Sequence, residues 1–208
     1  MLVQPFRAAA VELVPEPATS SDRIAVLVNA RARKVTDQVI RALSHVVPEG
    51  DFFQSRSLLD ARRIATQVVH QGYRTVLLGG GDGTVMCFIN EIAHQVSLKR
   101  HQFGVRMPRF GILKLGTGNS VASWMNASSA RGDGFVDDVL RVRSGTITAS
   151  RTVDMLQVEG KRAPFCGMGV DGHQALAVAQ IRVAEAVILG AEEDRDARRR
   201  RLRHELRS

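Results

Sequence analysis

The sequence has few aromatic and cysteine residues. Only 5% of its 208 residues are aromatic, with one Trp and one Tyr, and there are two Cys. So few aromatic side chains argue against a platform on which the bases of single-stranded nucleic acid stack. Cys87 and Cys166 lack the CxxC spacing of a zinc site and provide no disulfide framework. A reducing, cytoplasmic compartment is therefore expected.

Long apolar runs are also missing. The best candidate for a membrane span, residues 175–189, is interrupted by Gln180, Arg182 and Glu185. No run reaches the roughly 18 uncharged apolar residues needed to cross a bilayer. Residues 1–21 are broken by prolines and lack the basic and continuous apolar regions of a signal peptide, so we expect a flexible lead-in. The sequence predicts a soluble protein.

Positive charge, in contrast, is abundant, with a formal net charge of +8. Such a balance favours anionic partners, namely nucleotides, acidic lipid headgroups or nucleic acid. The Arg cluster 198–201 lies in a tail of mixed charge, for which disorder or a solvated helix end is expected. Weak adhesion of this tail to anionic lipid is the alternative. Nucleic acid is not predicted as a partner, because no recognition motif is present.

A strand, a turn and a helix alternate four times in the first part of the chain. Residues 24–28 are a continuous apolar run of strand length, further strands are expected at 51–54, 73–78 and 110–115, and a helix-like pattern follows each of the four. This alternation predicts an α/β fold over residues 22–146, with a doubly wound, Rossmann-like, mostly parallel sheet that has helices on both faces.

The pattern changes after residue 146. Residues 152–158 alternate between apolar and polar, 159–161 form a turn signal, and 163–168 are a second short run. These features predict a hairpin that begins a second, antiparallel β domain over 147–174. From about Ala175 the pattern becomes helical, so we expect a helix and then a charged, disordered tail over 175–208.

Two glycine-rich turns carry most of the functional information. Gly80–Thr84 and Gly116–Asn119 each lie between a strand-like and a helix-like run. Glycines allow close approach of a ligand, and the N–H groups of a following helix attract anions, so both turns suit phosphates. Neither turn is a Walker A loop or a GxGxxG fingerprint. The candidate phosphate-binding residues are Asn29, Gly80, Gly81, Asp82, Gly83, Thr84, Gly116, Thr117, Gly118 and Asn119.

Three of these residues have alternative roles. A carboxylate at Asp82 would repel phosphates unless it holds Mg²⁺ or accepts the proton of an attacking hydroxyl. The alternative is that Asp82 only caps a helix. Asn119 can donate to a phosphate or to the opposing turn, or it is only the cap of an ordinary left-handed (αL) turn. Asn29, which follows the first strand, is expected at the same rim.

The two turns together resemble a known family. The segment 78–84, with Asn90 six residues after Thr84, and the segment 115–119 resemble the catalytic domain of the diacylglycerol kinase and sphingosine kinase superfamily of lipid kinases. The GGDGT motif alone is ambiguous, because NAD kinases and phosphofructokinases have close relatives of it. The second motif separates them, since NAD kinases have an NxGxxGFL-type sequence there. The resemblance covers about residues 24–171.

The resemblance implies an ATP-dependent lipid kinase. In this family ATP and Mg²⁺ lie between an α/β nucleotide-binding domain and a β-rich lipid-binding domain. The candidate phosphate-binding residues would line the ATP site, with Asp82 as catalytic residue and metal ligand, and Asp171 would lie on the lipid side. The γ-phosphoryl group would pass to the hydroxyl of a diacylglycerol-like lipid, a step of phospholipid biosynthesis. The enzyme would be cytoplasmic and would contact the inner face of the membrane peripherally.

The chain also departs from the family pattern. Met86 and Cys87 stand where many bacterial members have Asn-Glu, and Lys114 stands where a Pro is frequent. Family members are longer and carry an acidic catalytic residue late in the β domain. One alternative is therefore a truncated or divergent relative that binds nucleotide without turnover. A further alternative is an enzyme resembling an NAD kinase.

Overall fold

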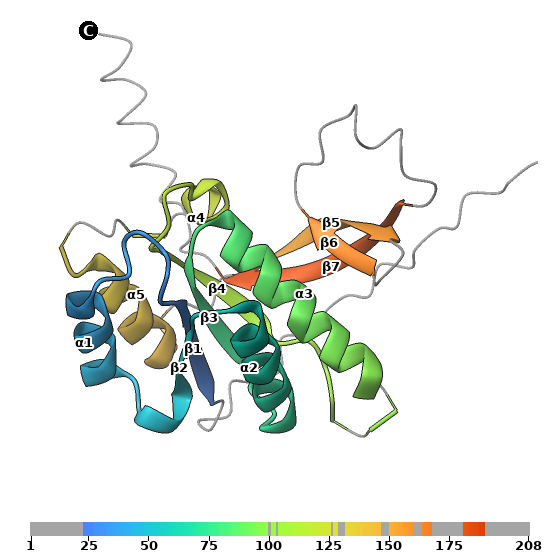
Figure 1. Cartoon of the computed structure of the whole chain (residues 1–208), viewed down its shortest axis with the longest axis horizontal. Helices are drawn as coiled ribbons and strands as arrows, with labels where there is room; N and C mark the ends of the chain where they lie inside the picture. Colours follow the sequence, from blue (N-terminus) through green and yellow to red (C-terminus); the bar gives the residue numbers. More distant parts are fainter. Residues whose placement is uncertain are drawn as a thin grey trace, which may run out of the picture.

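The computed structural model describes residues 23–99, 101–102, 104–125, 127–128, 132–146, 150–159, 164–167 and 181–189. The strands are β1 (Ile24–Asn29), β2 (Phe52–Ser55), β3 (Thr75–Gly80), β4 (Arg109–Lys114), β5 (Ser150–Glu159), β6 (Pro164–Gly167) and β7 (Ile181–Leu189). The helices are α1 (Asp37–Val46), α2 (Leu58–His70), α3 (Asp82–Lys99), α4 (Ser120–Trp124) and α5 (Gly134–Arg143), and a short 3₁₀ turn covers Glu49–Asp51. Within these residues the strands form one sheet in the order β2-β1-β3-β4-β7-β5-β6 (Figure 1).

The first four strands are parallel. β1 pairs with both β2 and β3, and β3 pairs with β4. In β1 the side chains of Ala25–Val28 are fully buried, as expected for a continuous apolar run covered on both faces. The predicted α/β fold with a mostly parallel sheet is confirmed.

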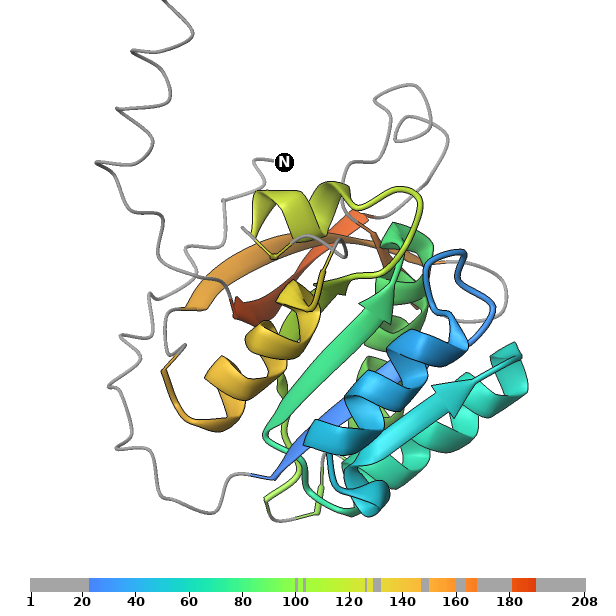
Figure 2. The ribbon, with the colours of Figure 1, turned by 90° about the vertical axis from the view of Figure 1, so that its left-hand side faces the viewer.

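Helices cover both faces of this parallel sheet. Ala25 and Leu27 of β1 pack in one cluster with the buried sides of α2, α3 and α4. Val26 and Val28 point to the other face, because side chains alternate along a strand, and they pack with α1 and α5. Figure 2 shows α1 and α5 together on the near side of the sheet. We call these two clusters the α3-side core and the α5-side core.

Local capping sets the helix boundaries. The hydroxyl of Ser57 accepts a hydrogen bond from the backbone N–H of Asp60 at the start of α2. The Asp60 carboxylate in turn accepts a bond from the N–H of Arg56, just before the helix. Gly72, with φ of 69°, follows the end of α2 in the left-handed conformation that ends many helices.

The three later strands extend the same sheet. β5 and β6 pair antiparallel with Glu159 opposite Pro164, which is the predicted hairpin. β7 pairs antiparallel with β5 along its whole length and parallel with β4 at Phe110 and Gly111. The helix expected from Ala175 is therefore wrong over Ile181–Leu189, which is a strand. Pairing with β5 outweighs the weak helical pattern there, because Ile and Val favour strands once a partner is present.

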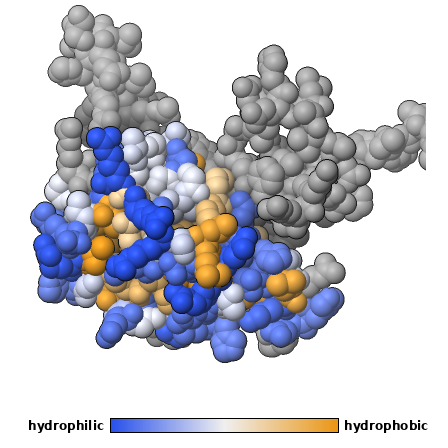
Figure 3. All heavy atoms as spheres, viewed as in Figure 1, coloured by the Kyte–Doolittle hydropathy of each residue, from blue (hydrophilic) through white to orange (hydrophobic). Residues whose placement is uncertain are grey.

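The surface of the described part is mainly hydrophilic on the face that Figure 3 shows, with smaller hydrophobic spots between the polar side chains. The exposed large apolar residues are Leu58, Leu59, Leu98 and Leu140. None of the helices that the structure describes has the length and apolar character needed to span a lipid bilayer. The lead-in 1–21 and the tail beyond Leu189 lie outside the described residues.

Candidate functional site

The order of the strands creates a crevice between the carboxyl ends of β1 and β3. From β1 the chain continues through α1 to β2 on one side, and from β3 it continues through α3 to β4 on the other. In open parallel sheets, ligands bind where the strand order reverses in this way. Asn29 and Gly80 are the last residues of these two strands. α4 lies at the end of the sheet toward which the arrow of β3 points (Figure 2).

A side-chain hydrogen bond spans this crevice. The amide nitrogen Nδ2 of Asn29 donates to the hydroxyl oxygen of Thr84 at 3.0 Å. The carbonyl oxygen of the Asn29 side chain accepts from the backbone N–H of Arg31 at 2.9 Å, which fixes the orientation of the amide. The Thr84 hydroxyl keeps its own hydrogen as a donor. Asn29 and Thr84, both predicted for the site, are thus brought together.

The two glycine turns pack against each other, backbone to backbone. A Cβ placed on Gly116 would lie 2.1 Å from the Cα of Gly81 and 2.8 Å from the carbonyl carbon of Gly80. A Cβ on Gly81 would lie 3.1 Å from the carbonyl oxygen of Gly118. Only residues without a side chain permit such an approach. The predicted pairing of the turns is therefore present, and their N–H groups share one rim of the sheet.

Asp82 joins the first turn to the helix that follows the second. Its Oδ2 accepts from the N–H of Ser120 and its Oδ1 from the N–H of Val121, both at 3.1 Å. These are the first N–H groups of α4, so Asp82 caps a helix other than its own. A carboxylate offers about four acceptor positions, and two remain for a metal ion or a proton. Ser120 and Val121 were not predicted for the site.

Asn119 closes its own turn. Its side chain accepts from the N–H of Gly116 at 3.0 Å and donates to the carbonyl oxygen of Gly116 at 2.6 Å. It makes no side-chain capping bond to α4, since Asp82 occupies that position. The alternative of a left-handed turn with Asn119 as cap is therefore wrong, because Asn119 has a φ of −148° and its side chain bonds back to Gly116.

The remaining candidate residues lie at the same rim. Gly83, Thr117 and Gly118 are exposed there, and a Cβ on Gly83 would meet nothing within 4 Å. Lys114, the last residue of β4, lies opposite Gly80 in the strand register and is partly exposed. Asp171 lies outside the described residues.

Two of the residues that depart from the family pattern pack inward. Met86 and Cys87 are partly buried and lie against the α3-side core. Burial raises the pKa of the Cys87 thiol, and the nearby Glu91 raises it further. A thiol with a raised pKa is a poor nucleophile at neutral pH. Cys87 therefore contributes packing rather than chemistry.

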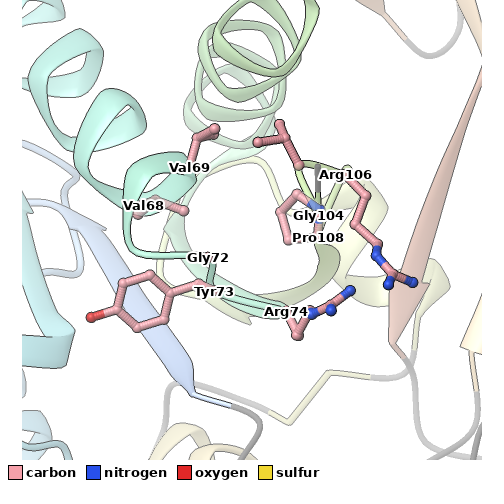
Figure 4. Close-up of a pocket in the computed structure, with 9 residues that line it drawn as sticks. Val68, Val69, Gly72, Tyr73, Arg74, Gly104, Arg106 and Pro108 are labelled. Carbon is pink, nitrogen blue, oxygen red and sulfur yellow. The ribbon is translucent and has the colours of Figure 1, made fainter. Parts of the chain in front are cut away.

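A small hollow lies at the opposite end of the sheet. It is lined by Val68, Val69, Gly72, Tyr73, Arg74, Gly104, Val105, Arg106 and Pro108, which surround an open depression in Figure 4. Arg74 precedes β3, whereas Gly80 ends that strand, so β3 separates the hollow from the glycine turns. The hollow is therefore separate from the candidate site, which the two glycine turns define.

Paired glycine turns at the strand-order reversal of a doubly wound α/β sheet are an arrangement that suits phosphate groups. Comparison with protein families matches residues 23–157 to the diacylglycerol kinase catalytic domain. The chain belongs to this family, because the match covers more than half of its length. Among curated proteins, no sequence matches the chain.

Three solved structures that are similar to the chain come from Bacillus anthracis str. Sterne. One is a diacylglycerol kinase with 16% sequence identity and a TM-score of 0.49, covering 77% of this chain and 53% of its own. A structure named as a candidate diacylglycerol kinase has 16% identity and a TM-score of 0.48, covering 67% of this chain and 45% of its own. Another structure named as a candidate diacylglycerol kinase has 15% identity and a TM-score of 0.48, and the match covers 80% of this chain and 64% of its own. The chain thus spans less than two thirds of the length of each.

Proposed function

We propose that this chain is the nucleotide-binding part of an ATP-dependent lipid kinase, which transfers the γ-phosphoryl group of ATP to the hydroxyl of a diacylglycerol-like lipid. The observation that carries the proposal is the contact between the Gly80–Thr84 and Gly116–Asn119 turns at the strand-order reversal. Two turns in contact offer the N–H groups of both to a chain of phosphates. Membership of the diacylglycerol kinase catalytic domain family supports the lipid acceptor.

The residues of the site have distinct parts in this proposal. N–H groups of both turns and the Thr84 hydroxyl bind the phosphates and orient the γ-phosphoryl group. Asn29 keeps the Thr84 hydroxyl in place. Asp82, through the acceptor positions that α4 leaves open, accepts the proton of the attacking hydroxyl or contacts the metal. Positioning and charge neutralisation supply most of the catalysis in phosphoryl transfer.

The donor set near the turns fits Mg²⁺ that arrives with the nucleotide. Mg²⁺ is commonly held by one or two carboxylates together with substrate phosphates and water. Asp82 supplies one carboxylate, and the described residues contain no group of three or more His, Cys, Asp or Glu that could hold a metal alone. Bound there, Mg²⁺ would neutralise the charge of the β- and γ-phosphates.

The test is transfer of labelled phosphate from ATP to diacylglycerol in mixed vesicles. Asp82→Asn should abolish transfer with the fold intact, because an Asn oxygen still accepts from one N–H of α4 but is a poor proton acceptor and metal ligand. Glu49→Gln, an exposed change near the amino end of β2, is the matched control and should retain transfer. Full activity of Asp82→Asn would reject the role of Asp82.

The same assay with NAD as acceptor tests the alternative of an NAD kinase. Absence of NADP formation would exclude that activity.

A second candidate function is nucleotide binding without turnover. The observation in its favour is that both Asp82 oxygens already accept N–H groups of α4, which gives this carboxylate a purely structural use. Binding of ATP by calorimetry, with no phosphorylated product from a panel of lipids, would support this candidate over the kinase.

Peripheral contact with the inner membrane surface is tested by co-sedimentation with vesicles that contain anionic lipid. Equal co-sedimentation with neutral vesicles would speak against such contact.

A further inference from the structure

The segment that follows α4 crosses from one face of the sheet to the other. Val121 and Ala122 of α4 pack in the α3-side core, and Ala127 still lies against it. Phe135 and Val139 of α5 pack in the α5-side core. The chain therefore passes from the α3-side core to the α5-side core between these two helices.

Ser128 is bound at the point where the chain reaches α5. The backbone N–H of Ser128 donates to Oδ2 of Asp138 and the Ser128 hydroxyl donates to Oδ1, both at 2.8 Å. Asp138 lies in the middle of α5 and is 9% exposed. Among the residues whose burial the structure describes, it is the only buried Asp, Glu, His, Lys or Arg.

A carboxylate is seldom buried without a structural reason. Its removal from water is strongly unfavourable unless its oxygens are hydrogen-bonded, and here the two donors of one serine satisfy both oxygens. Two buried hydrogen bonds between the same residues fix the position of Ser128 more closely than apolar contact would, because hydrogen bonds are directional.

α4 is thus held by a carboxylate at each end. Asp82 of α3 binds its first N–H groups, and Asp138 of α5 binds Ser128 beyond its last turn. The two anchors come from helices on opposite faces of the sheet. Because Gly116–Asn119 leads directly into α4, a shift of α4 would move this turn relative to Gly81.

We infer that Asp138, acting through Ser128 and α4, is a positioning residue for the second glycine turn and thereby for the phosphates of the nucleotide. Asp138 does not contact the ligand. It keeps the Gly116–Asn119 N–H groups at the distance from the first turn that two successive phosphates require. The part concerning nucleotide rests on the proposed function, whereas the part concerning the turn does not.

Two measurements test this inference on the full chain. Hydrogen exchange of the amides of residues 116–121 should be faster in Asp138→Asn and in Ser128→Ala than in the unaltered chain. Ser128→Thr keeps both donors and should exchange as slowly as the unaltered chain. The dissociation constant for ATP with Mg²⁺, by calorimetry, should rise about three- to tenfold in the first two variants, because small displacements of a binding turn weaken several contacts together. If Asp138→Asn does not fold, Ser128→Ala carries the test, since it removes one bond and leaves the carboxylate partnered.

Two control variants on α5 separate positioning from loss of charge and loss of stability. Asp137→Asn removes an exposed carboxylate beside Asp138, and Val139→Ala weakens the α5-side core without touching Ser128. Neither should selectively quicken exchange at residues 116–121. The inference would be overturned if exchange at residues 116–121 were equally fast in Asp138→Asn and Asp137→Asn. It would also be overturned if Val139→Ala quickened this exchange as much as Asp138→Asn does. An unchanged ATP dissociation constant would overturn it as well when the unaltered chain binds ATP. If the unaltered chain binds no ATP, the proposed function fails, and hydrogen exchange alone decides the role of Asp138.

Discussion

Gly116 lies directly against Gly81, so that a Cβ on Gly116 would come 2.1 Å from the Gly81 Cα. The obstacle is backbone, which cannot rotate away as a side chain would. Gly116→Ala should therefore lower the free energy of unfolding by about 3 kcal/mol or more, at the upper end for overpacked sites. Urea denaturation measures this loss. A loss below about 0.5 kcal/mol would show that the turns separate easily and are not a fixed pair.

Gly83 gives the opposite prediction for stability. It lies in the first turn of α3, and a Cβ there would have no atom within 4 Å. In a helix Ala is favoured over Gly by up to about 1 kcal/mol, so Gly83→Ala should leave the free chain equally or more stable. If phosphates approach this turn, the same methyl group should weaken ATP binding, measured by calorimetry. Unchanged affinity would mean that the ligand does not reach Gly83.

The bond between Asn29 and Thr84 predicts the effect of removing one hydroxyl. Thr84→Val keeps the shape of the side chain but leaves Nδ2 of Asn29 without its acceptor. We expect a loss of about 1 kcal/mol in the free energy of unfolding. If the hydroxyl also donates to a phosphate, ATP affinity should fall about tenfold. Thr84→Ser keeps the hydroxyl and is the matched control. Equal affinities of the Val and Ser variants would exclude a phosphate contact of the hydroxyl.

The sequence predicts those features of the structure that depend on residues close together in the chain. The run at 24–28 forms a strand whose central residues are buried on both faces, and a continuous apolar run indicates such burial directly. β7 was predicted as helix, since its strand form depends on pairing with β5, which precedes it by more than twenty residues. Local pattern carries no information about such a partner.

The candidate site divides in the same way. Its glycines and Asn29 were predicted, because turn residues after strands are visible in the sequence. The bonds from Ser120 and Val121 to Asp82 were not, because they join residues 38 and 39 positions apart. The bond between Ser128 and Asp138 depends on where the crossing segment meets α5, and neither residue stands out in its own sequence context. Pairs of this kind are determined by the packing of helices on the sheet.

A cluster at the amino ends of β1 and β3 gives a prediction for acid conditions. Asp51 accepts from Tyr73 at 2.6 Å and from Arg23 at 2.7 Å, and the Arg23 guanidinium lies 4.6 Å from the centre of the Tyr73 ring. Burial raises the pKa of Asp51, but the hydrogen bonds from Tyr73 and Arg23 outweigh it, and the net pKa is lowered. A carboxyl whose pKa is lowered by folding stabilises the folded state above its unfolded pKa, and this contribution disappears as the pH falls through its folded pKa.

Asp51→Asn should therefore destabilise the protein at pH 7, and the difference from the unaltered chain should shrink below about pH 4. Tyr73→Phe removes one of the two donors to Asp51, so it should lower stability by about 1 kcal/mol and reduce the dependence on acid pH. Urea denaturation between pH 7 and pH 3 measures both effects. ATP affinity at neutral pH should not change in either variant, because β3 separates this cluster from the glycine turns. A difference that stays constant down to pH 3 would show that the Asp51 charge does not stabilise the fold.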